Sequence, residues 1–178
     1  MNVRPARPEE QVEIDAIASH YDTGLSWQVE LRKANDETAM TFRTVPLPRS
    51  VRHTPPARPA PVPLESADRE YYIVAEETGG EILGYLRAEV EDWRRAAWIT
   101  HLTVVPRHRR NQVGATLVNH AKRWGRINDL HSLLAEVQMS NVPATRFLER
   151  CGFRLAGYND SLYASREVAL YFACRLES

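Results

Sequence analysis

The segment from Val104 to Ala115 combines features that could bind an anion. It follows an apolar run, passes through a turn that carries Arg107, Arg109 and Arg110, and enters a helical pattern at Gly114. The first N–H groups of a helix have no intrahelical acceptor and attract phosphate, and a glycine lets a ligand approach the backbone. The residues therefore predict a diphosphate site, although a plain strand–helix turn with a solvated basic face fits them equally well.

The elements around this turn follow from the spacing of apolar residues, which alternate in some segments and recur every three or four residues in others. Gly79-Gly80 joins two of the alternating segments as a β-hairpin, and Asn141 and Gly152 bracket a short helix as its caps. The predicted strands cover residues 71–75, 82–90, 98–105, 133–139, 153–157 and 168–176, and the predicted helices cover 113–124 and 141–151.

The order of these elements predicts an α/β (α+β) fold. A strand, a helix and a second strand follow one another between residues 98 and 139, and such a connection makes the two strands parallel. The remaining strands predict antiparallel pairs. We therefore expect a mixed, mostly antiparallel sheet that is flanked by helices and contains one parallel pair.

The N-terminal part is less regular. Residues 3–5 fit a short edge strand, residues 9–20 fit a helix, and residues 25–44 are ambiguous. Seven of the chain's 11 prolines lie between residues 45 and 64, with several arginines and no acidic residue. This composition predicts an extended loop inserted into a single domain of residues 1–178, either as a solvated insertion or as a lid that grips an anion.

Composition excludes several classes of protein. Among 178 residues, 23 Lys and Arg balance 23 Asp and Glu, which argues against a general nucleic-acid or membrane-surface binder. The sequence has neither an apolar run long enough to span a membrane nor a signal-peptide core at its start, so we expect a cytoplasmic protein. Two cysteines cannot build a disulfide framework or a closed zinc site, and no metal is expected.

Two motifs resemble a known family. The pattern V-x-P-x-x-R-x-x-Q-x-G-A at Val104–Ala115 is similar to the acetyl-coenzyme-A motif of the GNAT superfamily of N-acetyltransferases. The stretch Glu136–Ala144, together with Cys151-Gly152-Phe153, resembles the second signature of that superfamily. The resemblance covers roughly residues 70–176. Its C-terminal half looks most like streptothricin acetyltransferases, and residues 136–141 are also similar to ribosomal-protein N-terminal acetyltransferases.

The resemblance implies the GNAT fold, in which the parallel strand pair splays apart, and acetyl-coenzyme A as cosubstrate. The pantetheine arm would pass between the strands of Leu102–Val105 and Ala135–Met139, with backbone contacts near Leu102 and Val104 and a contact from Asn141. The diphosphate would lie on the backbone N–H groups of Arg109, Arg110, Gln112, Val113, Gly114 and Ala115.

Three positions depart from the family pattern. Gln112 stands where the middle glycine is usual, which a side chain tolerates if φ is negative. Thr100 stands where a strand glutamate often acts as base, and Leu148 stands where a tyrosine usually protonates the thiolate. Glu136 matches the glutamate of the N-terminal acetyltransferases and is the first candidate for the base, directly or through water, although it could also be a solvent-facing strand carboxylate.

Other candidates are less specific. His101, expected on the strand face opposite Thr100, titrates near neutral pH but could equally be a packed core residue. Tyr163 matches a family tyrosine near the acceptor cleft and could donate a proton or simply pack. Trp93, next to Asp92, could line the acceptor site, for which Glu136 is also a candidate, or it could pack in its hairpin. Cys151 is expected on a buried helix face, where a nucleophilic role is disfavoured.

These residues predict an N-acetyltransferase that transfers an acetyl group from acetyl-coenzyme A to a primary amine by direct attack. The first acceptor class is a cationic small molecule such as an antibiotic, and the second is a polypeptide N-terminus or lysine. A coenzyme-A-binding module that has lost catalysis and an RNA- or anion-binding domain remain as alternatives. The protein is expected to be a monomer or a homodimer.

Overall fold

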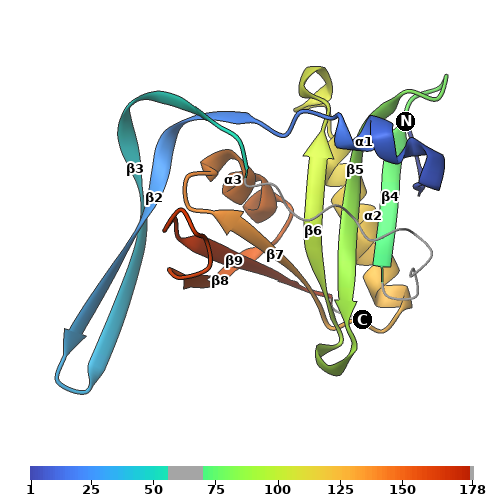
Figure 1. Ribbon diagram of the computed structural model, residues 1–178. Coiled ribbons are helices and arrows are strands. Elements are labelled where there is room, and N and C mark those ends of the chain that lie inside the picture. The colour runs from blue at the N-terminus through green and yellow to red at the C-terminus, as the bar shows by residue number, and fades with distance from the viewer. Residues whose placement is uncertain (56–69, 177–178) are drawn as a thin grey trace.

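The computed structural model describes residues 1–55 and 70–176, and its main feature is a seven-stranded sheet (Figure 1). The strand order is β1-β4-β5-β6-β7-β9-β8, and β6 and β7 form a parallel pair among antiparallel neighbours. The strands predicted from the alternating pattern are present, with ends that differ by one or two residues. They are β1 (Asn2–Pro5), β4 (Glu70–Glu76), β5 (Ile82–Glu91), β6 (Ala96–Val104), β7 (Ser132–Gln138), β8 (Arg154–Asn159) and β9 (Ala169–Arg175).

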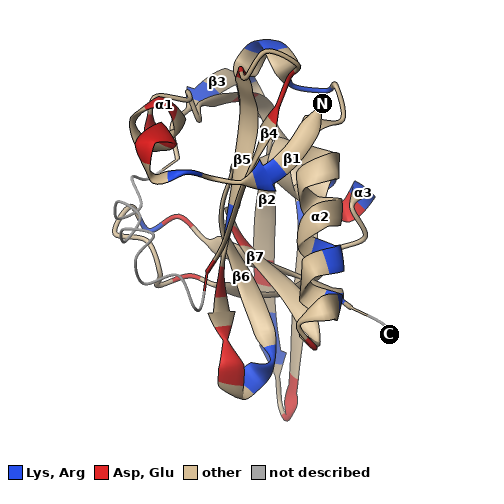
Figure 2. Cartoon of the chain, turned by 90° about the vertical axis from the view of Figure 1, so that its right-hand side faces the viewer, with Lys and Arg blue, Asp and Glu red and all other residues tan. Residues whose placement is uncertain are grey.

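Helix α2 (Val113–Ile127) covers one face of the sheet. Its apolar residues Leu117, Val118 and Ala121 are fully buried against β4 to β7, as the helical spacing predicts. Figure 2 shows basic residues on its exposed side. Because α2 fills this face, side chains on the same face of β5, β6 and β7 belong to the main hydrophobic core.

Helix α1 (Gln11–Asp15), which follows a 3-10 turn at Pro8–Glu10, packs on the opposite face near β4 and β5. The helix predicted over residues 9–20 is therefore wrong in length. Ile14 is buried but Val12 is 82% exposed, so this segment has few apolar contacts to stabilise further turns.

The parallel strands β6 and β7 pair only near their beginnings. The register joins Ala96–Ile99 to Ser132–Ala135, and the described ladder contains no β6–β7 pair beyond those residues, although β6 continues to Val104 and β7 to Gln138. The strands diverge as a fork that opens toward the N-terminus of α2, and this divergence is visible in Figure 1. The predicted splayed parallel pair is confirmed.

A β-bulge lies in β6 where the fork begins. Arg87 of β5 pairs with His101 and Ala88 pairs with Ile99, so Thr100 is an extra residue. A bulge breaks strict alternation and re-aims side chains. His101 Nδ1 lies 3.2 Å from Thr100 Oγ1, so the expectation that these two side chains occupy opposite faces is wrong.

Helix α3 (Val142–Arg150) follows β7 and is capped as the sequence predicts. The Asn141 side chain accepts a hydrogen bond from the Ala144 N–H, and Gly152 ends the helix with φ of +80°. Its buried face differs from the predicted stripe of Ala144, Phe147, Leu148 and Cys151: of these only Leu148 is fully buried, and the other buried positions are Val142 and Thr145.

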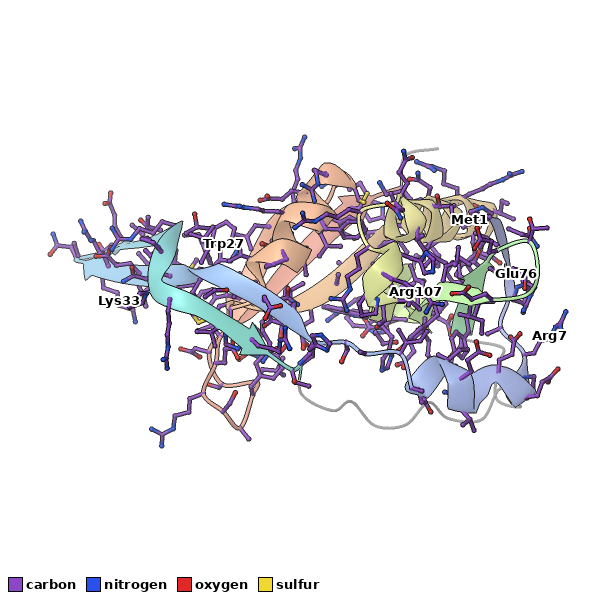
Figure 3. All side chains as sticks on the ribbon, turned by 90° about the horizontal axis from the view of Figure 1, so that it is seen from above. Met1, Arg7, Trp27, Lys33, Glu76 and Arg107 are labelled. Carbon is purple, nitrogen blue, oxygen red and sulfur yellow. The ribbon has the colours of Figure 1, made fainter. Side chains whose placement is uncertain are left out.

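Strands β2 (Tyr21–Ala34) and β3 (Glu37–His53) form a separate antiparallel ribbon that extends away from the sheet (Figure 1). Near its base the Trp27 N–H donates to the Met139 carbonyl, and Trp27 Nε1 donates to Thr145 Oγ1 of α3, both at 2.9 Å. Figure 3 shows Trp27 near this junction and Lys33 toward the far end. The ribbon is therefore anchored at the end of β7.

The predicted loop at residues 45–64 is wrong for residues 45–53, which belong to β3. Pro46 lies opposite Leu25, and the register is irregular between Thr23 and Leu25. In a ribbon of two strands every second N–H points away from the partner, where a proline removes no ladder hydrogen bond. Residues 56–69 lie outside the described residues.

The ribbon also engages one arginine of the supposed anion-gripping lid and another that lies just before it in the sequence. Arg52 forms an ion pair with Asp22, and Arg43 donates to the Gln28 side chain. Arg58 lies outside the described residues. Within the described part, the lid interpretation therefore has less free positive charge than the sequence suggests.

Candidate active site

The turn between β6 and α2 presents the beginning of α2 at the open end of the fork. The first backbone hydrogen bond of the helix runs from the Thr116 N–H to the Gln112 carbonyl, so the N–H groups of Val113, Gly114 and Ala115 precede the intrahelical ladder. Gln112 itself has φ of +63° and Arg110 has φ of +66°. Successive N–H groups in such a turn form a concave anion site.

The conformation of Gln112 corrects the sequence argument, which allowed a side chain there if φ were negative. Glutamine occupies the left-handed region that normally favours glycine, at a cost of about 1 kcal/mol. The turn thus keeps the backbone shape of a glycine turn without the glycine. Strain of this kind persists where the surroundings over-determine the conformation.

The three arginines of the turn have different environments. Arg107 forms an ion pair with Glu81, which with His108 holds the pKa of that carboxyl below its usual value. Among the described residues Arg110 has no ion-pair or hydrogen-bond partner. Of the turn arginines, Arg110 is thus the one whose guanidinium is available to a phosphate.

The Arg109 side chain faces the protein. Its guanidinium donates to the carbonyls of Val104 (3.1 Å), His20 (2.8 Å) and Ala18 (2.8 Å), and burial lowers the pKa of this group. Its backbone N–H points at the Pro106 carbonyl, 3.3 Å away. The structure gives Arg109 a tethering role between the turn and the segment that leads into β2, rather than the diphosphate contact predicted from the motif.

Gly114 has a packing reason that the sequence did not reveal. A Cβ built on this residue would lie 3.2 Å from the Phe147 ring of α3 and 3.6 Å from a Val104 methyl group. The missing side chain therefore allows α2 to approach α3 and β6. The expectation that Gly114 is small to admit a ligand is not supported by these contacts, although its N–H remains one of the helix-start donors.

Glu136 and Tyr163 meet at the closed end of the fork. Glu136 is the first residue of β7 beyond its last pair with β6, and its Oε1 accepts a 2.7 Å hydrogen bond from the Tyr163 hydroxyl. Tyr163 comes from the connection between β8 and β9, 27 residues away in sequence. The carboxylate is thus partly buried and oriented by a phenol, which is what a positioned base requires.

The other predicted residues are spread around this centre. Leu102 and Val104 lie on the diverging part of β6, and the Val104 carbonyl is occupied by Arg109. Asn141 uses its side-chain oxygen to cap α3. Trp93 is 78% exposed in the β5–β6 turn, beneath the Arg94 guanidinium, beyond the paired end of the fork. The structure does not bring Trp93 to Glu136.

Sequence reasoning missed two aromatic residues beside Glu136. Trp98 of β6 and Tyr171 of β9 form an edge-to-face pair with ring centroids 5.7 Å apart. Both alternate with buried neighbours in their strands, which places them on the sheet face opposite α2. That alternation was visible in the sequence, but the contact required the order of the strands.

The fork, the donors at the start of α2 and the Glu136 carboxylate together suit a cosubstrate with a diphosphate, a narrow arm and a reactive end. The diverging strands have no β6–β7 ladder to displace, and the helix-start N–H groups need an acceptor. These features match the requirements of an acyl-transferring site, and the donor set fits acetyl-coenzyme A.

Comparison with known proteins identifies the class. The model of the acetyltransferase (GNAT) family matches residues 36–153, and the chain belongs to that family. It is an acetyl-coenzyme-A-dependent N-acetyltransferase with an amine acceptor, as the sequence motifs predict.

Several individual proteins are similar to this chain in sequence or in structure. The chain is 28% identical over 128 residues to a streptothricin acetyltransferase of Escherichia coli, covering 69% of this chain and 73% of that protein. It is similar to a crystal structure of nourseothricin acetyltransferase, with a TM-score of 0.84, 26% identity and coverage of 99% and 98% of the two chains. The fold also matches a putative streptothricin acetyltransferase from Bacillus anthracis in complex with acetyl coenzyme A, with a TM-score of 0.81, 20% identity and coverage of 99% and 98%.

The described residues include no helix that is both long and apolar enough to cross a bilayer.

Proposed function

We propose that this N-acetyltransferase acts on a primary amine of a cationic small molecule of the streptothricin class. The main support is the likeness to nourseothricin acetyltransferase, which extends over 99% of this chain and so includes the ribbon as well as the GNAT sheet. The site adds a chemical reason, because Glu136 and two aromatic rings form a surface that suits an ammonium group.

In the proposed reaction Glu136 removes a proton from the acceptor. A primary ammonium has a pKa near 10 and must lose a proton before its nitrogen can attack. Tyr163 holds the carboxylate in place through its 2.7 Å hydrogen bond. The nitrogen then forms a bond to the acetyl carbon, and the carbon–sulfur bond of the thioester breaks. The nitrogen releases its second proton to solvent, which leaves a neutral amide.

The backbone of β6 supports this step. Residues 100–104 have no described β7 partner, so N–H groups on that side of β6 are available to an acyl oxygen, as in an oxyanion hole. At the other end, the N–H groups of Val113, Gly114 and Ala115, with Arg110, would hold the diphosphate. These contacts position the thioester at the closed end of the fork.

The proton for the leaving thiolate needs a donor. Leu148 is 4% exposed in the hydrophobic core and has no proton to give. Tyr163 carries a hydroxyl group that contacts Glu136, and we assign the donor role to it. After transfer, the proton taken by Glu136 returns to the phenol through the same hydrogen bond.

The test is an acceptor screen with acetyl-coenzyme A, read by mass shift and by release of free thiol. We expect a gain of one acetyl group on a streptothricin and slower or no acetylation of peptides with free N-termini or lysines. Acetylation of peptides alone would favour the protein-acceptor alternative. Saturable binding of acetyl-coenzyme A without turnover on any amine would favour a binding module instead.

Cellular location and assembly stay predictions. A cytoplasmic location suits an enzyme that uses acetyl-coenzyme A, and we propose that the protein works as a monomer or homodimer without nucleic acid or membrane partners. Sedimentation of the purified enzyme would measure the oligomeric state.

A further inference from the structure

We propose that Trp98 and Tyr171 form an acceptor-binding aromatic pair, which holds the cationic chain of the acceptor while its reacting amine lies at Glu136. This inference rests on the proposed function, because it assigns residues to the acceptor side of the same site. It concerns two positions that the motif comparison did not indicate.

The two faces of the sheet differ in how accessible they are to an amine. Ile99 and Ala135, the last paired residues of the fork, face the core that α2 covers. The residues next to them in β6 and β7 point to the opposite face of the sheet, which α2 does not cover. An acceptor therefore reaches the end of the fork from the face that carries Glu136.

The register of the strands shows which side chains lie next to one another on that face. Glu136 of β7 lies directly opposite Tyr171 of β9, and Trp98 of β6 lies opposite Leu134, two residues before Glu136. Opposite residues share a face, and residues two apart in a strand do too. Trp98, Leu134, Glu136 and Tyr171 therefore form one continuous patch across three strands.

The rings of Trp98 and Tyr171 are suited to contact a cationic ligand. Both are partly exposed, and they meet edge to face at 5.7 Å with an interplanar angle of 75°. The mutual contact holds both rings in place, and the exposed ring surface remains for a ligand. An aromatic face attracts an ammonium group and also packs against the methylene groups beside it.

Strand β5 adds a carboxylate to this patch, which favours binding of cations. Glu89 of β5 lies opposite Trp98 and is exposed. An acceptor molecule that lies across the indole of Trp98 would thus have Glu136 near one end and the Glu89 carboxylate near the other. This arrangement predicts a preference for acceptors with a second ammonium group over otherwise similar monoamines.

The test compares Trp98→Leu and Tyr171→Leu with the wild type, with acetyl-coenzyme A saturating and a streptothricin as acceptor. We expect KM for the acceptor to rise about 3- to 30-fold, with little change in KM for acetyl-coenzyme A. Trp98→Phe keeps a ring and should recover part of the loss. As a second probe, 1,5-diaminopentane and pentylamine should show a diamine preference in kcat/KM that Trp98→Leu reduces.

Two further variants serve as comparisons. Trp124→Leu removes an indole that stacks on Tyr71 at 4.3 Å on the α2 side, and it should lower thermal stability without changing acceptor KM. Trp93→Leu tests the tryptophan that the sequence singled out. An unchanged acceptor KM in both Trp98→Leu and Tyr171→Leu would overturn the inference, as would an effect of Trp93→Leu in their place. Absence of turnover on any amine in the wild type would refute the proposed function instead.

Discussion

The coenzyme side of the site is built mainly from backbone groups, whereas the acceptor side is built from side chains. On the coenzyme side the groups we assign are mainly backbone N–H groups, at the start of α2 and along the diverging part of β6. On the acceptor side they are side chains, Glu136 with Tyr163 and the Trp98–Tyr171 pair. Backbone groups are present whatever the residue, so the coenzyme side can tolerate a substitution such as Gln112 that preserves the conformation.

This difference explains why the departures from the family pattern have unequal consequences. Gln112 changes a side chain but keeps the turn. Thr100 and Leu148 remove functional groups, and the roles of base and acid must then come from elsewhere. The structure supplies a carboxylate and a phenol in contact at one position, on strands and loops that differ from the usual ones.

The largest expected effect is on the acceptor side. Glu136→Gln keeps the shape but removes the carboxylate that we propose as the proton acceptor, so kcat should fall about 100-fold or more while affinity for acetyl-coenzyme A stays within about twofold. Steady-state kinetics and calorimetry measure the two effects. Glu77→Gln, a change of an exposed glutamate in the β4–β5 turn, is the matched control. Rates equal to wild type at all pH values would remove Glu136 from the mechanism.

The next effect tests the tether on the coenzyme side. Arg109→Ala removes three hydrogen bonds from a charged donor to the carbonyls of Val104, His20 and Ala18, and should lower the free energy of unfolding by about 2–4 kcal/mol. We expect weaker binding of acetyl-coenzyme A, because the turn loses its support. Arg107→Ala, which removes an exposed ion pair with Glu81 and a hydrogen bond to the neighbouring His108, should have a much smaller effect on unfolding in denaturant. Equal losses in the two variants would contradict the tethering role.

A smaller effect should appear at Gln112. Gln112→Gly relieves the positive φ and should raise the free energy of unfolding by about 1 kcal/mol, with affinity for acetyl-coenzyme A unchanged or higher. Thermal unfolding and calorimetry provide the two measurements. Gln112→Ala keeps the strain and should show no such gain. If glycine weakened coenzyme binding, the glutamine side chain itself would have to contact the ligand.

The smallest effect is expected at Cys151. Burial raises the pKa of this thiol, so at pH 7 to 8 it is neutral and a poor nucleophile. Cys151→Ala should therefore keep kcat within about twofold, and iodoacetamide should modify the wild-type residue slowly. A loss of turnover with intact folding would indicate a covalent route and contradict direct attack by the amine.

Several features of the fold could be predicted because their signals are local. Alternation in β5 and β9, the helical spacing of α2 and the Asn141 and Gly152 caps of α3 each lie within a few residues. The ribbon shows where such signals were present but overlooked, since Leu25, Trp27, Val29 and Leu31 alternate with polar residues in β2. Prolines in β3 obscured its partner, because their effect depends on which N–H groups face the other strand.

The sequence by itself determined the family, the cosubstrate, the strand–turn–helix that presents backbone donors, and Glu136 as the first choice of base. The tertiary structure decided where β6 and β7 stop pairing, which carbonyls Arg109 occupies, and which side chains gather around Glu136. The physical reason is distance along the chain. Caps and periodicity depend on neighbours within one or two turns, whereas the Tyr163 hydrogen bond and the Trp98–Tyr171 contact join segments that only the strand order brings together.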